Sequence, residues 1–345
     1  MAFALPRNHG ARLMTGVSFN GIAAVILENE LVRMTVLSGK GGDVFEFLHK
    51  PSDTDFMWRN PLGLPRADRL VNGNDRLKSF FDFYFGGWQE LFPHGSAPEE
   101  NLGQQNYFHG ELTLSPMDVT VVEDTPKRVA VKLSTRLRLS PFTVEKTFTL
   151  AAGSGAVEIH ERIENFGKVA VRAMWGHHPA FGEPFLTPET RLFAPVEAFR
   201  HNEGPEQTDW PNLRHADGRV EDLSRLPDFR RDTNDMVYPS KLSAGWYALI
   251  DPKKQVGFGM VWDPKLFPYL WIWRNFTRKG GWPWYGGARA LAVEPFSSFP
   301  RAVSKGGRMI TVGPGKTLET RLLALAISGV KRVKNISRQG KITRG

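Results

Sequence analysis

Between residues 118 and 164, apolar and polar side chains alternate almost without a break. The alternation runs through 118–123, 128–139, 142–150 and 156–164, and Asp-Thr-Pro and Ser-Pro breaks separate the first three segments. A period of two places successive side chains on opposite faces of an extended chain. This stretch therefore predicts consecutive antiparallel strands, each with one face on a core and one face toward solvent.

The same period recurs on both sides of this stretch, first at 21–27 and 31–37 around a Glu-Asn-Glu turn, and later at 245–250, 256–262, 269–273, 290–294 and 317–327. No long segment carries apolar residues at the spacing of a helix face. The 34 glycines and 24 prolines suit many short strands joined by tight turns. We therefore predict an all-β protein in which large antiparallel sheets pack as a sandwich.

Two stretches interrupt the pattern, at 51–105 and 196–240. Residues 196–240 are polar, and we predict a long insertion with little regular structure there. Residues 51–105 are also expected to be rich in loops, and they hold a Phe- and Trp-rich stretch at 79–95. No linker divides the chain, so we predict one β-sandwich domain over 1–330. Residues 331–345 carry six lysines and arginines and no acid, which predicts a flexible basic tail.

The charge and composition exclude several classes of function. The net charge is +9, but +3 remains once the six cations of 331–345 are set aside, so we expect no nucleic-acid partner. The chain has no cysteine, which excludes disulfides, thiolate metal sites and a cysteine nucleophile. No apolar run approaches the roughly 20 residues of a membrane helix, and no signal peptide is evident at the start. We expect a cytoplasmic protein that does not bind membranes.

Three short segments, far apart in the sequence, carry groups that can move a proton. They are Phe-His-Gly-Glu at 108–111, Trp-Gly-His-His-Pro-Ala-Phe-Gly at 175–182 and Val-Glu-Pro-Phe at 293–296. One carboxylate and two histidines suffice for general acid–base chemistry on a small molecule. Glu294 follows the apolar run ALAV, and a carboxylate at the end of a buried strand is costly unless it is paired or used.

The adjacent histidines, His177 and His178, point to opposite faces if their segment is extended. Pro179 favours an extended conformation for His178, and on this basis we choose His178 as the one that faces a pocket. His177 stays a candidate for contact with the substrate. We predict no metal site, because no third ligand stands at a recognisable spacing.

Tryptophans near these segments suggest a sugar as the small molecule, since flat indole rings cover the apolar faces of sugars and offer N–H donors. Trp88 and Trp175 are the best candidates, because both adjoin polar segments. Trp271 and Trp273 share one face of a strand. For most of the tryptophans we expect packing in the core.

At these residues the sequence resembles the galactose mutarotase (aldose 1-epimerase) superfamily. The resemblance lies in the order of three pieces: His109-Gly110, the segment 178–181 (His-Pro-Ala-Phe) and the segment 293–295 (Val-Glu-Pro). The glycine-rich turn within 38–50 also looks like the opening of that family. The likeness spans roughly residues 20 to 328.

The resemblance implies a β-supersandwich with a sugar in an open cleft, and no cofactor. By the same likeness, Glu294 matches the general base, His178 the general acid on the ring oxygen, and His109 a second histidine that holds the ring oxygen or a hydroxyl. Asp263 resembles a substrate-binding aspartate. Gln89 lies where the chain departs from the commoner members, and it could bind hydroxyls. We expect a monomer or homodimer that interconverts the anomers of a hexose.

Two alternatives stay open at this point. The first is an epimerase for a phosphorylated or sulfonated sugar, because Arg172, Arg274 and Arg278 could pair with an anionic group. The second is a carbohydrate-binding protein without catalysis, since a fold does not fix a function.

Overall fold

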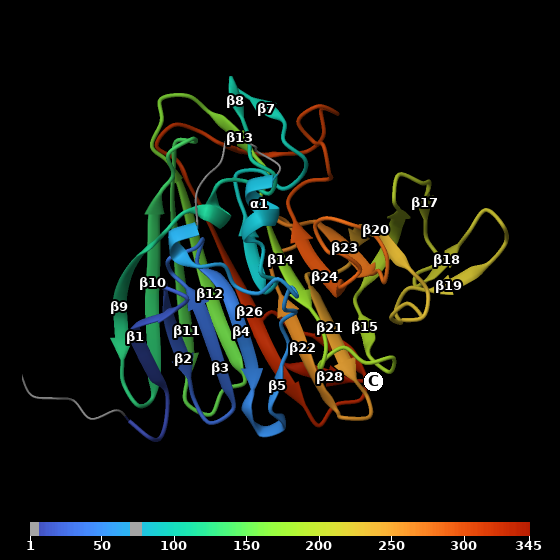
Figure 1. Cartoon of the computed structure of the whole chain (residues 1–345), viewed down its shortest axis with the longest axis horizontal. Helices are drawn as coiled ribbons and strands as arrows, with labels where there is room; N and C mark the ends of the chain where they lie inside the picture. Colours follow the sequence, from blue (N-terminus) through green and yellow to red (C-terminus); the bar gives the residue numbers. More distant parts are fainter. Residues whose placement is uncertain (1–6, 70–77) are drawn as a thin grey trace, which may run out of the picture.

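The computed structural model describes residues 7–69 and 78–345, and strands make up nearly all of the regular structure (Figure 1). The larger of two main sheets has twelve strands, which pair with their neighbours in antiparallel fashion. In spatial order they are β1 (Arg12–Phe19), β2 (Ile22–Glu28), β3 (Val32–Leu37), β4 (Asp43–His49), β6 (Trp88–Leu91), β14 (Gly176–Phe181), β24 (Arg289–Phe296), β23 (Tyr269–Phe276), β20 (Thr233–Leu242), β16 (Val196–His201) and β17 (Glu206–Gln207), with β5 (Thr54–Asp55) beside β4.

The second main sheet has eight antiparallel strands and contains the stretch of regular alternation. Its order is β15 (Arg191–Phe193), β21 (Trp246–Asp251), β22 (Val256–Val261), β26 (Thr317–Ser328), β12 (Ala156–Asn165), β11 (Phe142–Ala151), β10 (Arg128–Arg136) and β9 (Asp118–Asp124). In β11, buried and half-buried residues alternate along the strand, as a sheet with one face on a core requires.

Four two-stranded pairs and a few short helical turns complete the fold. The pairs are β7 (Glu100–Asn101) with β8 (Gln104–Gln105), β13 (Val171–Ala173) with β25 (Ile310–Val312), β18 (Asn212–Arg214) with β19 (Val220–Asp222), and β27 (Val333–Ile336) with β28 (Ile342–Arg344). The helical pieces are α1 (Lys78–Phe83) and the 3₁₀ turns at Lys50–Ser52, Ala67–Arg69 and Leu112–Leu114. Within the described residues, no helix has the length and apolar character needed to cross a membrane.

The core lies between the two main sheets. Its largest cluster takes buried side chains from both sheets, from Ala11 to Ala324. The ring of Phe258 in the smaller sheet lies 5.8 Å from that of Phe47 and 4.8 Å from that of Phe181, both in the larger sheet. Burial of a phenylalanine contributes about 1.5–3 kcal/mol. The prediction of an all-β sandwich of large antiparallel sheets is therefore confirmed.

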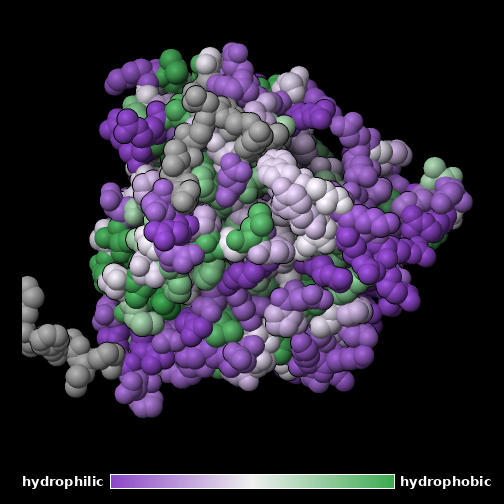
Figure 2. All heavy atoms as spheres, in the orientation of Figure 1, coloured by the Kyte–Doolittle hydropathy of each residue, from purple (hydrophilic) through white to green (hydrophobic). Residues whose placement is uncertain are grey.

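The prediction of little regular structure over 196–240 is wrong. Strands β16 and β20 pair with each other, and β20 pairs with β23, so this stretch extends the larger sheet. The connecting segment forms the small strands β17–β19, which project at one side of the molecule (Figure 1). That side is mostly hydrophilic (Figure 2). The polar composition of this segment explains why its sequence predicts a loop.

The C-terminal residues also differ from the flexible basic tail that their charge suggested. Strands β27 and β28 form a hairpin. Val333 and Ile336 pack with Trp246 in a second hydrophobic cluster, on the face of the smaller sheet that points away from the main core. The lysines and arginines of this hairpin therefore lie on an ordered, partly buried element.

Candidate active site

Strand β14 lies in the middle of the larger sheet and determines which side chains meet at the site. In the sheet register His178 pairs with Gln89 of β6, and Glu294 of β24 pairs with Trp271 of β23. The pairing of Gly176 with Phe296 and of Ala180 with Ala292 places His178 opposite Glu294. Directly paired residues share a face, so one row of side chains crosses the sheet on the face away from the core.

A cleft of about 360 Å³ lies on this outer face. Its walls come from α1, the segments 95–97 and 108–109, the strands β20, β23 and β24, and the loops that follow β23 and β24. The lining residues are mostly aromatic, with a few polar groups: Phe80, Phe81, Tyr84, Gly95, Ser96, Ala97, Phe108, His109, His178, Asn234, Met236, Tyr238, Trp271, Trp273, Trp284, Glu294, Pro300 and Arg301.

Glu294 and His178 form the floor of the cleft. The Nε2 atom of His178 lies 3.6 Å from Oε1 of Glu294, and the side chains are 6% and 2% exposed. The second carboxylate oxygen of Glu294 is buried and has no hydrogen-bond partner among the described residues. Burial raises the pKa of Glu294 well above its usual range and lowers the pKa of His178 to about 4, because both charged forms lose hydration. The site therefore holds a neutral imidazole beside a carboxyl group that binds a proton more tightly than an ordinary glutamate does.

His109 reaches the same cleft from a tight turn. Its φ of 63° and the φ of 79° at Gly110 are both left-handed. A Cβ atom at Gly110 would lie 2.3 Å from the carbonyl oxygen of Phe92, so only glycine fits there. Nδ1 of His109 lies 2.9 Å from the carbonyl oxygen of Gly95. Since a carbonyl only accepts hydrogen bonds, Nδ1 carries the proton and Nε2 is left as an acceptor.

The environment of His109 also keeps its ring uncharged. Burial and then the neighbouring His178, with its ring centroid 5.5 Å away, lower the pKa of His109 well below its usual range. The rings of Phe80 and Phe108 lie against the imidazole. The three proton-handling residues of the sequence analysis, Glu294, His178 and His109, thus line one cleft.

His177, Trp88 and Trp175 do not line this cleft, because they point to the opposite face of the sheet. The indole N–H of Trp88 donates to Nδ1 of His177, and Nε2 of His177 lies 3.2 Å from Glu161 of the smaller sheet. The indole N–H of Trp175 donates to Glu90. These residues belong to a polar cluster inside the core, so the prediction that they contact a substrate is corrected.

That cluster contains a buried ion pair between the two sheets. Nζ of Lys146 lies 2.7 Å from Oε2 of Glu90 and donates to the carbonyl of Gly41. Burial raises the pKa of Glu161 to about 7 and lowers the pKa of His177 to about 4. We call Glu90, Lys146, Glu161 and His177 the intersheet cluster.

The structure also places Gln89 and Asp263 outside the cleft lining. Gln89 shares the face of His178 but is fully buried, and its amide donates to the carbonyl of Gly86. Asp263 lies in a separate depression with His160 and Glu319, where its carboxylate accepts from the backbone of Lys265. Direct contact of either residue with a sugar in the cleft is therefore not supported, which corrects the sequence-based expectation.

Several lining residues were not singled out from the sequence. The loops and α1 supply Tyr84, Phe80, Phe81 and Phe108 from segments with no periodicity. Asn234 and Tyr238 lie on β20, which the sequence analysis interpreted as irregular. Trp271 and Trp273 did give a signal, since both were expected on one face of a strand, and that face is the cleft face.

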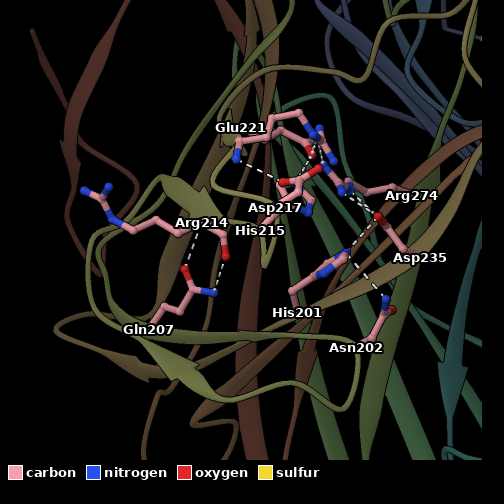
Figure 3. A network of polar contacts seen from close by, with 10 residues as sticks. His201, Asn202, Gln207, Arg214, His215, Asp217, Glu221, Asp235 and Arg274 are labelled. Atoms are coloured by element: carbon pink, nitrogen blue, oxygen red, sulfur yellow. Dashed lines mark hydrogen bonds and ion pairs between the residues drawn. The ribbon is translucent and has the colours of Figure 1, made fainter.

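The arginines that suggested a charged sugar lie elsewhere. Arg274 is on the opposite face of β23 from Trp273, and its guanidinium donates to Asp235 and Glu221 (Figure 3). Arg172 donates to the carbonyl of Gly307. Arg278 is absent from the residues that line the cleft, and Arg301 is the one arginine among them.

The Arg274 network holds in place the strand β23, which forms one wall of the cleft, from the face opposite the cleft. His201 lies 3.0 Å from Asp235 and His215 lies 3.0 Å from Glu221, so each carboxylate has a histidine partner besides Arg274 (Figure 3). Burial would raise the pKa of Asp235, but hydrogen bonds from His201 and Arg274 outweigh it and hold the pKa at about 2. The network ties β19 and β20 to β23, which carries Trp271 and Trp273. Within the described ranges, no group of three or more His, Asp or Glu side chains is arranged to hold a metal ion.

The sandwich has counterparts among solved structures at low sequence identity. A protein provisionally named aldose 1-epimerase from Klebsiella pneumoniae superposes with a TM-score of 0.70 at 14% identity, covering 92% of this chain and 83% of that one. Galactose mutarotase-like proteins from Clostridium acetobutylicum and Lactobacillus casei give TM-scores of 0.64 and 0.59 at 12% and 18% identity. They cover 92% and 88% of this chain, and 99% and 100% of their own. The fold is therefore the galactose mutarotase-like β-sandwich, as the resemblance implied.

The family to which the chain belongs is more specific than the fold. Residues 19–325 match the family described as Domain of unknown function (DUF4432), and the protein is a member of it. No curated protein matches the chain in sequence.

Proposed function

We propose that this protein is an aldose 1-epimerase that interconverts the α and β anomers of a hexose or hexose derivative. The observation that supports the proposal is the opposed pair of Glu294 and His178 on the floor of an aromatic cleft. A base and an acid at this separation can act on the two oxygens attached to one anomeric carbon.

In the proposed reaction, the Glu294 carboxylate takes the proton of the anomeric hydroxyl, and a C1=O bond forms. The bond between C1 and the ring oxygen breaks, and the ring oxygen takes the proton of Nε2 of the neutral His178, which carries the negative charge as an imidazolate until that proton returns on ring closure. The C1 carbonyl then turns over, and the same steps in reverse close the ring with the opposite configuration. The raised pKa of Glu294 favours proton removal from a weakly acidic hydroxyl.

The other lining groups would bind and orient the sugar. Nε2 of His109 is an acceptor for a hydroxyl, because its Nδ1 proton is donated to Gly95. Trp271 offers a flat platform, stacked on Phe296 with ring centroids 3.8 Å apart, for an apolar sugar face. A cytoplasmic location and a monomeric or dimeric state stay predictions.

Two-dimensional exchange NMR of α and β anomers tests the proposal. We expect faster exchange for at least one sugar in a panel of aldoses, and loss of this acceleration in Glu294→Gln. Glu161→Gln is the matched control, because Glu161 is equally buried but lies in the intersheet cluster. No acceleration with any sugar, or full activity of Glu294→Gln, would contradict the proposal.

A second candidate is the same reaction on an anionic sugar, and Arg301 favours it. Its side chain is 57% exposed, and the ion pair of its guanidinium with Glu203 is long, at 3.8 Å. Phosphorylated and sulfonated hexoses in the same panel distinguish the two candidates. Preference for an anionic sugar that is lost in Arg301→Gln would support the second, whereas equal rates on neutral and anionic sugars would contradict it.

A further inference from the structure

Tyr84 is a buried hydroxyl at the floor of the cleft, and neither the sequence motifs nor the proposed chemistry assign it a role. It is 3% exposed, and its ring stacks on Phe80 with centroids 4.9 Å apart. The carbonyl of Tyr84 accepts from the side chain of Asn60. The residue is therefore fixed at both its backbone and its ring.

The hydroxyl of Tyr84 faces the catalytic pair. It lies 3.5 Å from Nδ1 of His178, whose other ring nitrogen, Nε2, faces Glu294 at 3.6 Å. The three groups thus form a line from Tyr84 through the imidazole to the carboxylate. Catalytic hydrogen bonds that are long in a free enzyme commonly shorten when a substrate binds.

We propose that Tyr84 is a positioning residue, which donates its hydroxyl proton to Nδ1 of His178 and thereby keeps the imidazole proton on Nε2, toward the substrate. This inference rests on the proposed function for its catalytic consequence, but the proton position itself does not. In a neutral imidazole only one nitrogen carries a proton, and the hydrogen bond at the other nitrogen decides which.

The protonation states of Tyr84 and His178 make the tyrosine hydroxyl the donor and Nδ1 the acceptor of this hydrogen bond. Burial, and then the nearby carboxylates of Glu294 and Asp43, raise the pKa of Tyr84 well above its usual range, so its oxygen keeps the proton. In the opposite tautomer Nδ1 would itself donate, and the buried Tyr84 proton would lose the acceptor that His178 provides. The backbone of His178 also competes for the ring proton, which makes that opposite tautomer the alternative to test.

For the reaction, the consequence is that His178 already carries its proton on the nitrogen that faces the substrate. With the proton on Nε2, His178 can donate to the ring oxygen of a bound sugar without first changing tautomer. Without Tyr84 both tautomers would be populated, and a part of the enzyme would present an acceptor where a donor is needed. His109 is preset in the opposite sense, because Gly95 holds its proton on Nδ1.

Tautomers are read directly by two-bond ¹H–¹⁵N correlation of protein labelled with ¹⁵N in its histidines, with His178 assigned by its absence in His178→Gln. We expect a proton on Nε2 in the unmodified protein and a mixture of both tautomers in Tyr84→Phe. Tyr247→Phe is the control, since Tyr247 is also buried but its hydroxyl has no partner among the described residues. A proton on Nδ1 in the unmodified protein, or an unchanged spectrum in Tyr84→Phe, would overturn the inference.

Kinetics provide a second test, because a positioning role and a merely structural role of Tyr84 change kcat and KM differently. For a sugar that the protein turns over, we expect kcat of Tyr84→Phe to fall about tenfold, with KM changed less than twofold and a shifted pH profile. A rise in KM and a fall in kcat, together with lowered thermal stability, would overturn the positioning role. If the Nε2 tautomer is found but no sugar is turned over, the proposed function fails and the inference about Tyr84 stands.

Discussion

The two faces of β14 make an instructive comparison. His177 and His178 are neighbours in one strand, both are almost fully buried, and burial lowers the pKa of each to about 4. Yet His178 lines a cleft, whereas His177 lies between the sheets, where it accepts a hydrogen bond from the indole N–H of Trp88 and faces Glu161. Burial and a perturbed pKa therefore do not mark a functional residue by themselves. Access to a cavity separates the two cases.

The sharpest test of this comparison is the effect of His178→Asn on catalysis. Loss of a general acid should lower the rate of anomer exchange by about 10²–10⁴-fold, with little change in the midpoint of thermal unfolding. The measurement is exchange NMR on the sugar that the unmodified protein turns over. Equal activity of the variant would remove the functional distinction between the two faces.

The inner face should respond most strongly to Lys146→Met. The substitution leaves Glu90 without its cation in the core, and breaking a buried ion pair typically costs about 3–5 kcal/mol. Urea unfolding measures this loss. The double variant Lys146→Met, Glu90→Gln should recover much of it, and a double variant no more stable than the single one would show that the charge of Glu90 is not the cause.

The pH dependence of stability should also originate on the inner face. The pKa of Glu161 is about 7 in the folded protein, above the usual 4.5, so its contribution is fully present below about pH 4.5 and is lost as the pH rises through 7. With each pKa unit worth about 1.4 kcal/mol, the loss is on the order of 3 kcal/mol. We therefore expect the free energy of unfolding, measured with urea between pH 5 and 8, to fall less steeply with pH in Glu161→Gln than in the unmodified protein. Identical slopes would exclude Glu161 as the source.

The smallest expected effect is that of His177→Leu. This variant keeps an apolar group of similar size but leaves the indole N–H of Trp88 without an acceptor, which costs about 1–2 kcal/mol. Thermal unfolding should report this loss, while anomer exchange should stay within about twofold of the unmodified rate, the range expected when no group that contacts substrate is changed. A large loss of activity without a loss of stability would place His177 with His178 in function.

The sequence predicted the parts of the fold in which one face of a strand is buried. Strands β10 to β12 follow the alternation closely, because their outer side chains are mostly polar and their inner ones apolar. Strand β9 alternates in sequence, but its valines are exposed. Strand β14 gave no such pattern, since all six of its residues are buried and they include two histidines and a proline. Strands β16 and β20 lie near one end of the larger sheet and carry many exposed or half-buried polar side chains, so their hydrophobic periodicity is weak.

The site was predictable where the motif residues themselves reach the cleft, as Glu294, His178 and His109 do. The tryptophans were misplaced, because nearness in sequence to a motif does not give the same face. Trp175 and His177 are two residues apart, and both point toward the core. Trp88, on the neighbouring strand β6, points to the same face and donates to His177. Tyr84 belongs to a loop whose position depends on tertiary packing, so no local pattern could indicate its contact with His178.

The position of the site has a consequence for motion. Its floor lies on β14 and β24, which are central strands with hydrogen-bonded neighbours on both sides. Its mouth is formed by α1 and nearby loops, where the ring of Phe81 lies against the rings of Phe108 and Trp282. Central strands exchange their amide hydrogens only in nearly global unfolding, and loops do so in small local openings. We therefore expect a ligand to enter by local rearrangement of the rim, while Glu294 and His178 on the floor keep their mutual geometry throughout.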